Sequence, residues 1–178
     1  MELRDRDIII DYKSKTKLKI GDLFFFPASF DGLRLWDSNI TLARYIFLNK
    51  DLFERKKIIE LCSGTGIASI AAKKFTQASM IAATDYHAEV TENVLFNCKK
   101  NGITSGMVIA AISWKEYATF KNTFDFVIAA DIVTKSCPVD LLEKCLRILL
   151  NIGGYALFIL PKRSLELTTK FMNSLDKT

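Results

Sequence analysis

Residues 57–68 constrain the fold of this chain more than any other stretch. They read Lys-Ile-Ile-Glu-Leu-Cys-Ser-Gly-Thr-Gly-Ile-Ala, an apolar run that reaches an acidic residue and then the glycines Gly64 and Gly66. Glycines accept positive φ angles and let backbone approach a ligand, and a helix that begins after them directs free N–H groups to the same place. The next apolar run ends in a second carboxylate, Asp85. This pattern predicts a strand, a tight turn, a helix and a second strand around a ligand.

The two carboxylates indicate which ligand suits such a pocket. Asp85 can accept hydrogen bonds from both hydroxyls of a ribose. Glu60, directly before the turn, would repel a pyrophosphate but can attract an amino group. S-adenosylmethionine has an ammonium, a sulfonium and a ribose but no phosphate, so it is favoured over NAD, whose fingerprint would also require Gly or Ala in place of Ser69. An NAD-linked oxidoreductase, and a plain strand–turn–helix corner without a ligand, are the alternatives.

Apolar runs and helical periodicities alternate along most of the chain. The expected strands cover residues 57–62, 79–85, 107–112, 124–130 and 154–160, and the expected helices cover 66–75, the stretch after 85 up to about 100, 138–150 and 164–175. Ahead of them we expect a hairpin or two short strands at 7–12 and 17–26, and a helix that Asp37 or Ser38 caps and that runs to about residue 49. Because strands such as 124–130 are apolar throughout, we predict a mainly parallel sheet with helices on both faces: a Rossmann-like, doubly wound α/β fold with a short N-terminal hairpin.

Open sheets of this type bind ligands at the carboxyl ends of their strands, where the strand order reverses. Glu60, Asp85, Trp114 and Asp131 all lie at or just after such ends. Trp114 can stack on an adenine, and a tryptophan packed in the core is the simpler alternative. Asp131 follows a strongly apolar strand, where it can either hold a substrate amine or cap the next segment.

Composition fits a globular domain and excludes several classes of protein. With 178 residues, 49% of them hydrophobic, we predict one domain over residues 1–178, with N-terminal strands in 1–31 and a cofactor-binding core in 32–178. No apolar run is long enough to span a membrane and the charged N-terminus lacks a signal-peptide core. We therefore expect a cytoplasmic protein, with the nucleus as the second possibility, and no membrane partner.

Cysteine, histidine and charge content exclude further functions. The four cysteines show no C-x-x-C spacing and His87 is the single histidine, so no metal site is expected. A Ser–His–Asp hydrolase would need His87 as its base, and its position just after Asp85 disfavours that reading. The net charge of +5 demands no acidic partner, so we expect no specific nucleic acid, and a monomer is favoured.

Five segments, in this order, resemble the class I, seven-β-strand S-adenosylmethionine-dependent methyltransferases. More narrowly they resemble the lysine-methyltransferase-like group, also labelled nicotinamide N-methyltransferase-like (methyltransferase family 16). The segments are Gly32–Ser38 with Trp36, Glu60–Gly66, Asp85 with Asn93, Asn97 and Asn101, Ile112–Trp114, and Phe124–Val133 with Ala130 and Asp131. They cover about residues 32–161, and the ordered set is far more specific than any one segment.

The resemblance implies transfer of a methyl group from S-adenosylmethionine to an amine nitrogen, with a lysine side chain of another protein as the expected substrate. Asp131 is the expected catalytic residue, which would orient the amine. The expected cofactor-binding residues are Trp36, Glu60, Gly64, Gly66, Asp85, Trp114 and Ala130. For Trp36, packing against the methionine side of the cofactor and simple docking of the following helix both stay open.

The chain departs from the family pattern at two motif positions and at its C-terminal end. Cys62 stands where the first motif glycine is usual, and Thr134 replaces the tyrosine that closes the last motif. The family ends its sheet with an antiparallel hairpin, and we expect none before Thr178. These departures keep a catalytically inactive cofactor-binding interaction module open as an alternative, beside a small-molecule N- or O-methyltransferase.

Overall fold

A parallel five-stranded sheet forms the centre of the molecule. The computed structural model describes residues 4–22, 28–162 and 165–175. The sheet strands are β3 (Lys57–Glu60), β4 (Met80–Asp85), β5 (Val108–Ala111), β6 (Phe124–Ala130) and β7 (Leu150–Ile159). Their order is β5-β4-β3-β6-β7 and every neighbouring pair is parallel. The strand order therefore reverses between β3 and β6, and the predicted doubly wound topology is confirmed.

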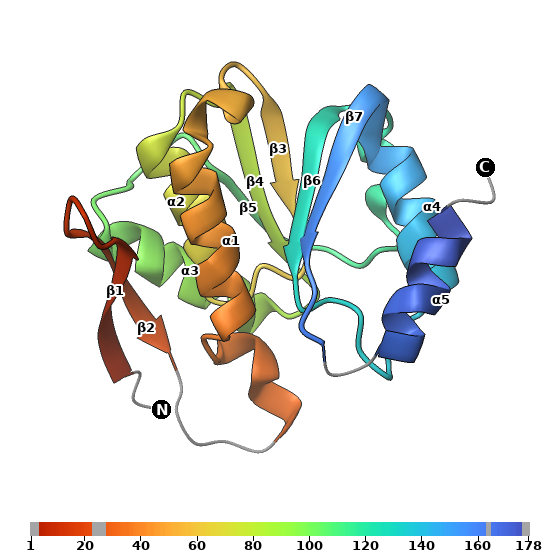
Figure 1. Ribbon diagram of the computed structural model, residues 1–178, viewed down its shortest axis with the longest axis horizontal. Coiled ribbons are helices and arrows are strands. Elements are labelled where there is room, and N and C mark those ends of the chain that lie inside the picture. The colour runs from red at the N-terminus through yellow and green to blue at the C-terminus, as the bar shows by residue number, and fades with distance from the viewer. Residues whose placement is uncertain (1–3, 23–27, 163–164, 176–178) are drawn as a thin grey trace.

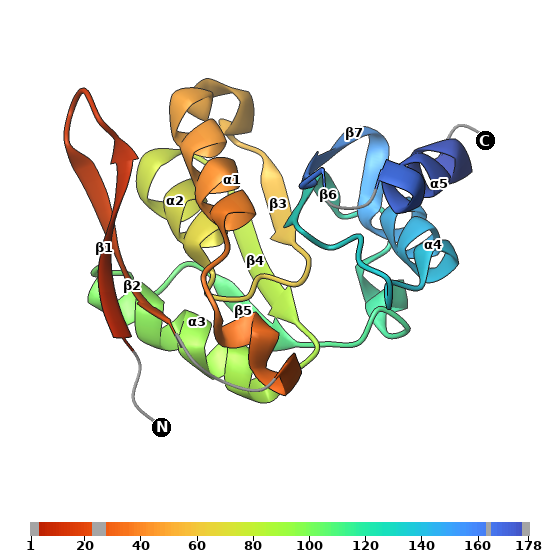
Figure 2. The same ribbon diagram turned by 60° about the horizontal axis from the view of Figure 1, so that its bottom comes forward.

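Helices cover both faces of this sheet (Figures 1 and 2). Helices α1 (Asp37–Leu48), α2 (Ile67–Phe75) and α3 (Ala88–Lys100) lie on one face, and α4 (Val139–Leu149) and α5 (Leu165–Leu175) lie on the other. Three short 3-10 helices, Ala28–Leu33, Lys50–Phe53 and Tyr117–Phe120, complete the described elements. Neighbouring residues of one strand serve opposite faces: Ile58 packs in the cluster of α1 and α2, and Ile59 packs in the cluster of α4. This two-sided burial is why the strands read as apolar throughout.

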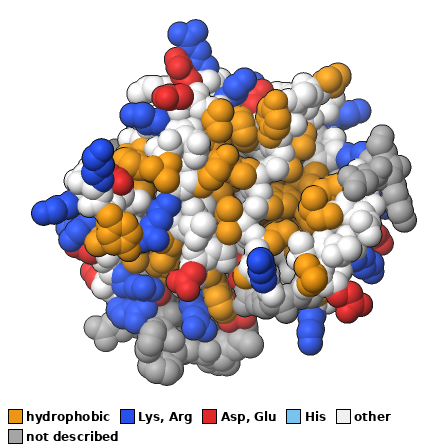
Figure 3. Space-filling model, viewed as in Figure 1, with side chains coloured by type: hydrophobic (Ala, Val, Ile, Leu, Met, Phe, Trp, Pro, Cys, Tyr) orange, Lys and Arg blue, Asp and Glu red, His pale blue; other side chains and the backbone are white. Residues whose placement is uncertain are grey.

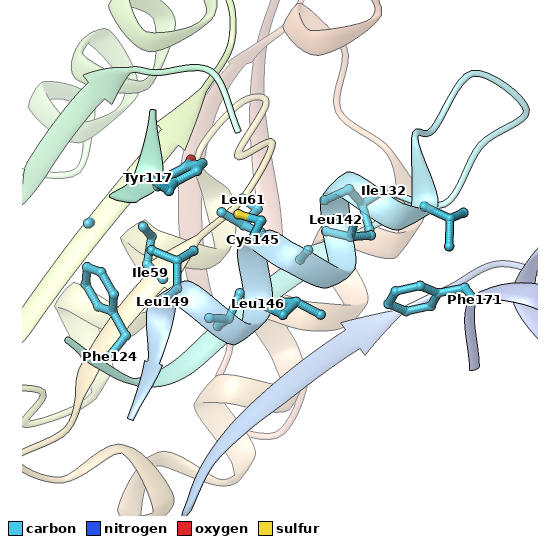
Figure 4. Packing of buried hydrophobic residues seen from close by; sticks show 14 residues of the cluster. Ile59, Leu61, Tyr117, Phe124, Ile132, Leu142, Cys145, Leu146, Leu149 and Phe171 are labelled. Atoms are coloured by element: carbon cyan, nitrogen blue, oxygen red, sulfur yellow. The ribbon is translucent and has the colours of Figure 1, made fainter. Parts of the chain in front are cut away.

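Helix α4 supplies one side of the largest buried cluster (Figure 4). Leu142, Cys145, Leu146 and Leu149 recur at helical spacing and are all nearly inaccessible to solvent. They pack toward Ile59 and neighbouring residues at the strand ends, and Phe171 of α5 joins the cluster at its far end. The cluster fixes α4 against the sheet and so fixes the loop that leads from β6 into α4.

A separate antiparallel hairpin packs outside α3. Its strands are β1 (Arg4–Asp11) and β2 (Thr16–Asp22). The prediction of strands at 7–12 and 17–26 is confirmed up to residue 22, and residues 23–26 lie outside the described chain. Asn97 of α3 accepts a hydrogen bond from Gly21 N at 2.7 Å and donates one to Gly21 O at 3.2 Å. Asn101 makes the same pair of bonds with Lys19 N and O, so amide side chains of a helix take the place of a neighbouring strand.

Two predicted boundaries are wrong. Strand β7 begins at Leu150 rather than at residue 154, because Gly153 and Gly154 lie in an irregularity inside the strand. Neither Asp37 nor Ser38 caps α1 with its side chain, since Trp36 is the N-cap residue in an extended conformation.

Within the described residues, β7 is an edge of the sheet. Its Tyr155 is 66% exposed and stacks on Phe126 with 5.5 Å between the ring centroids. On the same side of the molecule, hydrophobic side chains gather over α1 and β7 (Figure 3). No described helix is long and apolar enough to cross a bilayer.

Candidate functional site

A cavity of about 530 Å³ lies at the carboxyl ends of β3, β4 and β6, where the strand order reverses. This size is within the range of small-molecule and cofactor sites. Five segments of the chain meet there: the residues before and within α1, the β3–α2 turn, the end of β4, the loop after β6, and α5. The lining residues are Asp31, Gly32, Trp36, Asn39, Cys62, Gly64, Asp85, His87, Ala130, Asp131, Ile132, Val133, Thr134, Lys135 and Leu167.

The turn between β3 and α2 brings backbone to the cavity. Gly64 and Gly66 have φ angles of 54° and 76°. A Cβ at Gly66 would lie 2.7 Å from Val94 Cγ1, so this position has neither the backbone freedom nor the space for a side chain. Cys62 holds a φ of 51° although it is not glycine, which costs about 1 kcal/mol. Cys62, which stands where the first motif glycine is usual, therefore carries backbone strain that glycine would avoid.

Glu60 lies beneath the turn, and the structure does not include it in the cavity lining. Its side chain is inaccessible to solvent, and its Oε2 accepts hydrogen bonds from Ser69 N at 2.9 Å and Ser69 Oγ at 2.5 Å. The carboxylate therefore serves the first turn of α2, where the helix dipole favours a negative charge. Burial nevertheless raises the pKa of Glu60 to about 7. The geometry shows that Glu60 holds the start of α2 through Ser69. Attraction of a ligand ammonium by Glu60 stays a prediction.

Asp85 lines the cavity and holds the turn from the other side. Its Oδ2 accepts a hydrogen bond from Gly64 N at 3.1 Å, and its Oδ1 accepts one from Tyr86 N at 2.8 Å. The side chain is 8% exposed, and burial raises the pKa of Asp85 above its ordinary value. The glycine turn and the carboxylate at the end of the next strand are thus in direct contact, as the sequence pattern predicted.

Hydrogen-bonding capacity is unused at the end of β3 and in the turn that follows. Among the described residues there, Glu60 Oε1, Ser63 Oγ and Thr65 Oγ1 are buried and make no hydrogen bond. Buried polar atoms are normally paired, so three such atoms close together in the chain are unusual. None of these three residues lines the cavity, where Asp85 and the Gly64 backbone offer polar groups to a nucleoside such as S-adenosylmethionine.

The loop after β6 forms the other end of the cavity. Ala130, expected to bind the cofactor, and Asp131, expected to be catalytic, both line it. Asp131 has a φ of 57°, unusual for a residue with a side chain, and its N–H donates to Ile159 O at 2.9 Å. Backbone strain held by surrounding structure often marks a functional position. Thr134, in place of the family tyrosine, lines the cavity next to Asp131.

The two tryptophans have different surroundings. Trp36 lines the cavity, its Nε1 donates to Asp31 O at 3.1 Å, and the Arg34 guanidinium lies 4.6 Å from the ring centroid. Both roles considered for it, contact with a ligand and docking of α1, are compatible with this position. Trp114 is half-buried against the α4 cluster and is not among the lining residues, so the structure does not bring it to the cavity. Its predicted adenine contact therefore has no support from the geometry.

Several lining residues could not be selected from the sequence. Asn39, Lys135 and Leu167 come from α1, the β6–α4 loop and α5, and only the packing of these elements against the sheet brings them together. Asn39 had one usable signal in the sequence, because it is an amide at helical spacing from the apolar residues Leu42, Ala43 and Ile46.

Comparisons with known proteins agree on one family. The family model described as lysine methyltransferase matches residues 29–178. Calmodulin-lysine N-methyltransferase of Arabidopsis thaliana is 29% identical over 148 residues, which is 79% of this chain and 48% of that protein. EEF1A lysine methyltransferase 3 of Mus musculus is 32% identical over 118 residues, 64% of this chain and 49% of that protein. The chain thus spans about half of these relatives' length, and less of some others.

Solved structures agree on the fold. The ribosomal protein L11 methylase from Lactobacillus delbrueckii subsp. bulgaricus superposes with a TM-score of 0.67 at 19% identity, covering 96% of this chain and 88% of that one. A structure described as an S-adenosyl-L-methionine-dependent methyltransferase from Methanococcus maripaludis gives a TM-score of 0.59 at 20% identity, over 75% and 60% of the two chains. At these identities the likeness shows the shared Rossmann-like architecture.

Proposed function

Because the chain belongs to the lysine methyltransferase family, we propose that it transfers a methyl group from S-adenosylmethionine to the side-chain amine of a lysine in another protein. The observation that carries the proposal is the two-ended cavity at the strand reversal. Asp85, bonded to the glycine turn, ends β4, and Asp131 directly follows β6, so the two carboxylates lie on opposite sides of β3 in the strand order and mark two ends of the cavity. A donor nucleoside and an acceptor amine need such separate but adjoining places.

The cofactor end would hold S-adenosylmethionine through three kinds of group. Asp85 would accept hydrogen bonds from the ribose hydroxyls, as carboxylates at the end of the second strand do in dinucleotide folds. The backbone of the turn at Cys62 and Gly64, which line the cavity, would face its polar atoms. Trp36 lines the same cavity and offers an apolar surface.

The protein's task in the reaction is alignment and charge stabilisation. The bound sulfonium supplies an already activated methyl group, so the protein needs no nucleophile of its own. A carboxylate beside the acceptor, such as Asp131, would hold the amine in line and stabilise the positive charge that develops on nitrogen. Walls formed by Ala130, Ile132 and Leu167 would exclude water from the reacting atoms.

Calorimetry followed by a transfer assay tests the proposal. S-adenosylhomocysteine should bind to the purified chain, whereas NAD and ATP should not. With methyl-labelled S-adenosylmethionine and a cell lysate, label should enter the protein fraction as methyllysine. Label confined to small molecules would instead favour a nicotinamide-like methyltransferase, and binding without any transfer would favour an inactive interaction module. Cytoplasmic location and a monomeric state complete the proposal.

A further inference from the structure

Lys135 is the only lysine or arginine among the described residues that line the cavity. It belongs to the acceptor end, on the same loop as Asp131 and directly after Thr134. Its side chain is exposed to solvent, and none of the ion pairs among the described residues includes it. An amine thus lies on the wall of a cavity that is proposed to accept amines.

Backbone hydrogen bonds hold Lys135 in this place. Cys137 N donates to Thr134 O at 3.0 Å and closes a four-residue turn that has Lys135 and Ser136 at its corners. The hydroxyl oxygens of Thr134 and Ser136 are 3.1 Å apart across the same turn. On the preceding side, the bond from Asp131 N to Ile159 O ties the loop to β7. Lys135 is therefore presented from a fixed corner of the loop.

More acidic than basic side chains line the cavity, and this negative charge favours the presence of a protonated amine inside it. Asp31, Asp85 and Asp131 line the same cavity, and Cys62 and His87 are its other titratable side chains besides Lys135 itself. Carboxylates around an amine attract its ammonium to the cavity and stabilise the charge that a methylated nitrogen keeps.

We propose that Lys135 is a methyl acceptor of its own chain, so that the protein methylates itself at this position. The inference rests on the proposed function, because it uses the same donor. The Lys135 ammonium first loses one proton to water. Its neutral Nζ then attacks the methyl carbon of S-adenosylmethionine, the new N–C bond forms as the C–S bond breaks, and the sulfur keeps the electron pair and leaves as S-adenosylhomocysteine. The product is a methylated Lys135 ammonium.

Peptide mass spectrometry tests this modification directly. The purified chain incubated with S-adenosylmethionine alone should gain methyl groups on the peptide that contains Lys135. Lys135→Arg should lose that signal, whereas Lys121→Arg should keep it. Lys121 is the matched control because it is exposed and precedes β6, at the opposite end of the strand from the cavity. If transfer occurs within one chain, the fraction modified per unit time should not change when the protein is diluted.

A second measurement does not depend on turnover. Acylation of lysine amines, read by mass spectrometry, should slow at Lys135 but not at Lys121 when S-adenosylhomocysteine is bound, because the cofactor would occupy the same cavity. Unchanged acylation of Lys135 at saturation would contradict its place beside the donor.

The outcomes separate this inference from the proposed function. Labelled lysate proteins together with an unmodified Lys135 would overturn self-methylation and leave the proposed function intact. Faster lysate methylation by Lys135→Ala but not by Lys135→Arg, again without modification of Lys135, would show a cationic gate instead and also overturn it. Failure of S-adenosylhomocysteine to bind would overturn both proposals. Equal modification of Lys121 and Lys135 would show unselective chemistry and contradict the inference.

Discussion

At the scale of single residues, two carboxylates hold the glycine turn from opposite sides. Glu60 holds the helix side through Ser69, and Asp85 holds the strand side through Gly64 N. Both acids were predicted to contact the ligand, but only Asp85 reaches the cavity lining. The direction in which Glu60 points depends on its pairing with Ser69, nine residues away, and a local motif does not show that.

Asp85 should carry much of the affinity for the cofactor. Asp85→Ala removes two charge-assisted hydrogen bonds to the ribose and should weaken S-adenosylhomocysteine binding by about 2–4 kcal/mol. Calorimetry measures this loss, and circular dichroism checks that the variant folds. Asp51→Ala, an exposed acid in a 3-10 helix far from the cavity lining, is the control and should bind normally. Unchanged affinity in folded Asp85→Ala would remove Asp85 from the site.

Glu60 should make the stability of the cofactor-free protein depend on pH. Its pKa is about 7 in the folded protein against an ordinary 4.5, because burial disfavours the charged form. Below about pH 4.5 both folded and unfolded states hold the proton. Between the two values only the folded state does, so stability should fall as pH rises and level off above about pH 7. One pKa unit corresponds to about 1.4 kcal/mol, which gives a total fall of about 3 kcal/mol.

Urea unfolding from pH 4.5 to 8 measures this dependence. Glu60→Gln keeps the shape and an acceptor for Ser69 N, so its stability should fall much less with pH than that of the natural protein, with only the contribution of groups such as Asp85 remaining. The same pH slope in both proteins would mean that other groups cause it.

At the scale of elements, α3 connects the N-terminal hairpin to the site. The side chain of Asn97 bonds to Gly21 of β2 and, through Nδ2, to Thr65 O in the glycine turn at 2.9 Å. One amide thus joins the hairpin, the helix and the cofactor turn. The sequence offered Asn97 and Asn101 as parts of a motif, and the physical reason for them is that helix amides replace strand partners for β2.

Replacement of Asn97 should therefore loosen the hairpin. Asn97→Leu is similar in size but leaves Gly21 N and Thr65 O buried without partners, so the free energy of unfolding should fall by about 3–5 kcal/mol. Hydrogen exchange should also accelerate at the β2 amides. Asn49→Ala, which loses one exposed bond to Tyr45 O, is the matched control and should cost under about 1 kcal/mol. Equal costs for the two variants would contradict the bridging role.

At the scale of the whole molecule, the sheet brings the proposed donor and acceptor sites to one edge. Strand–helix alternation and apolar strands were enough to predict the parallel sheet. Asp85 and Asp131 line the cavity because strand ends meet at one edge, whereas Ala130, which also lines it, was expected only from the family resemblance. Trp114 also follows a strand end, but its side chain packs toward α4. The places of Lys135 and Leu167 in the cavity lining could not be predicted from the sequence, because the course of the β6–α4 loop and the docking of α5 depend on long-range packing.

The turnover of Asp131→Asn, set against its affinity for S-adenosylhomocysteine, tests the two-ended cavity most directly. The variant keeps the shape of the side chain and removes its charge. Label transfer from S-adenosylmethionine to the lysate protein fraction should fall by about two to three orders of magnitude, the scale of a lost electrostatic stabiliser, while the affinity for S-adenosylhomocysteine changes little. Full activity, or an equal loss of affinity and turnover, would contradict the assignment of Asp131 to the acceptor end of the cavity.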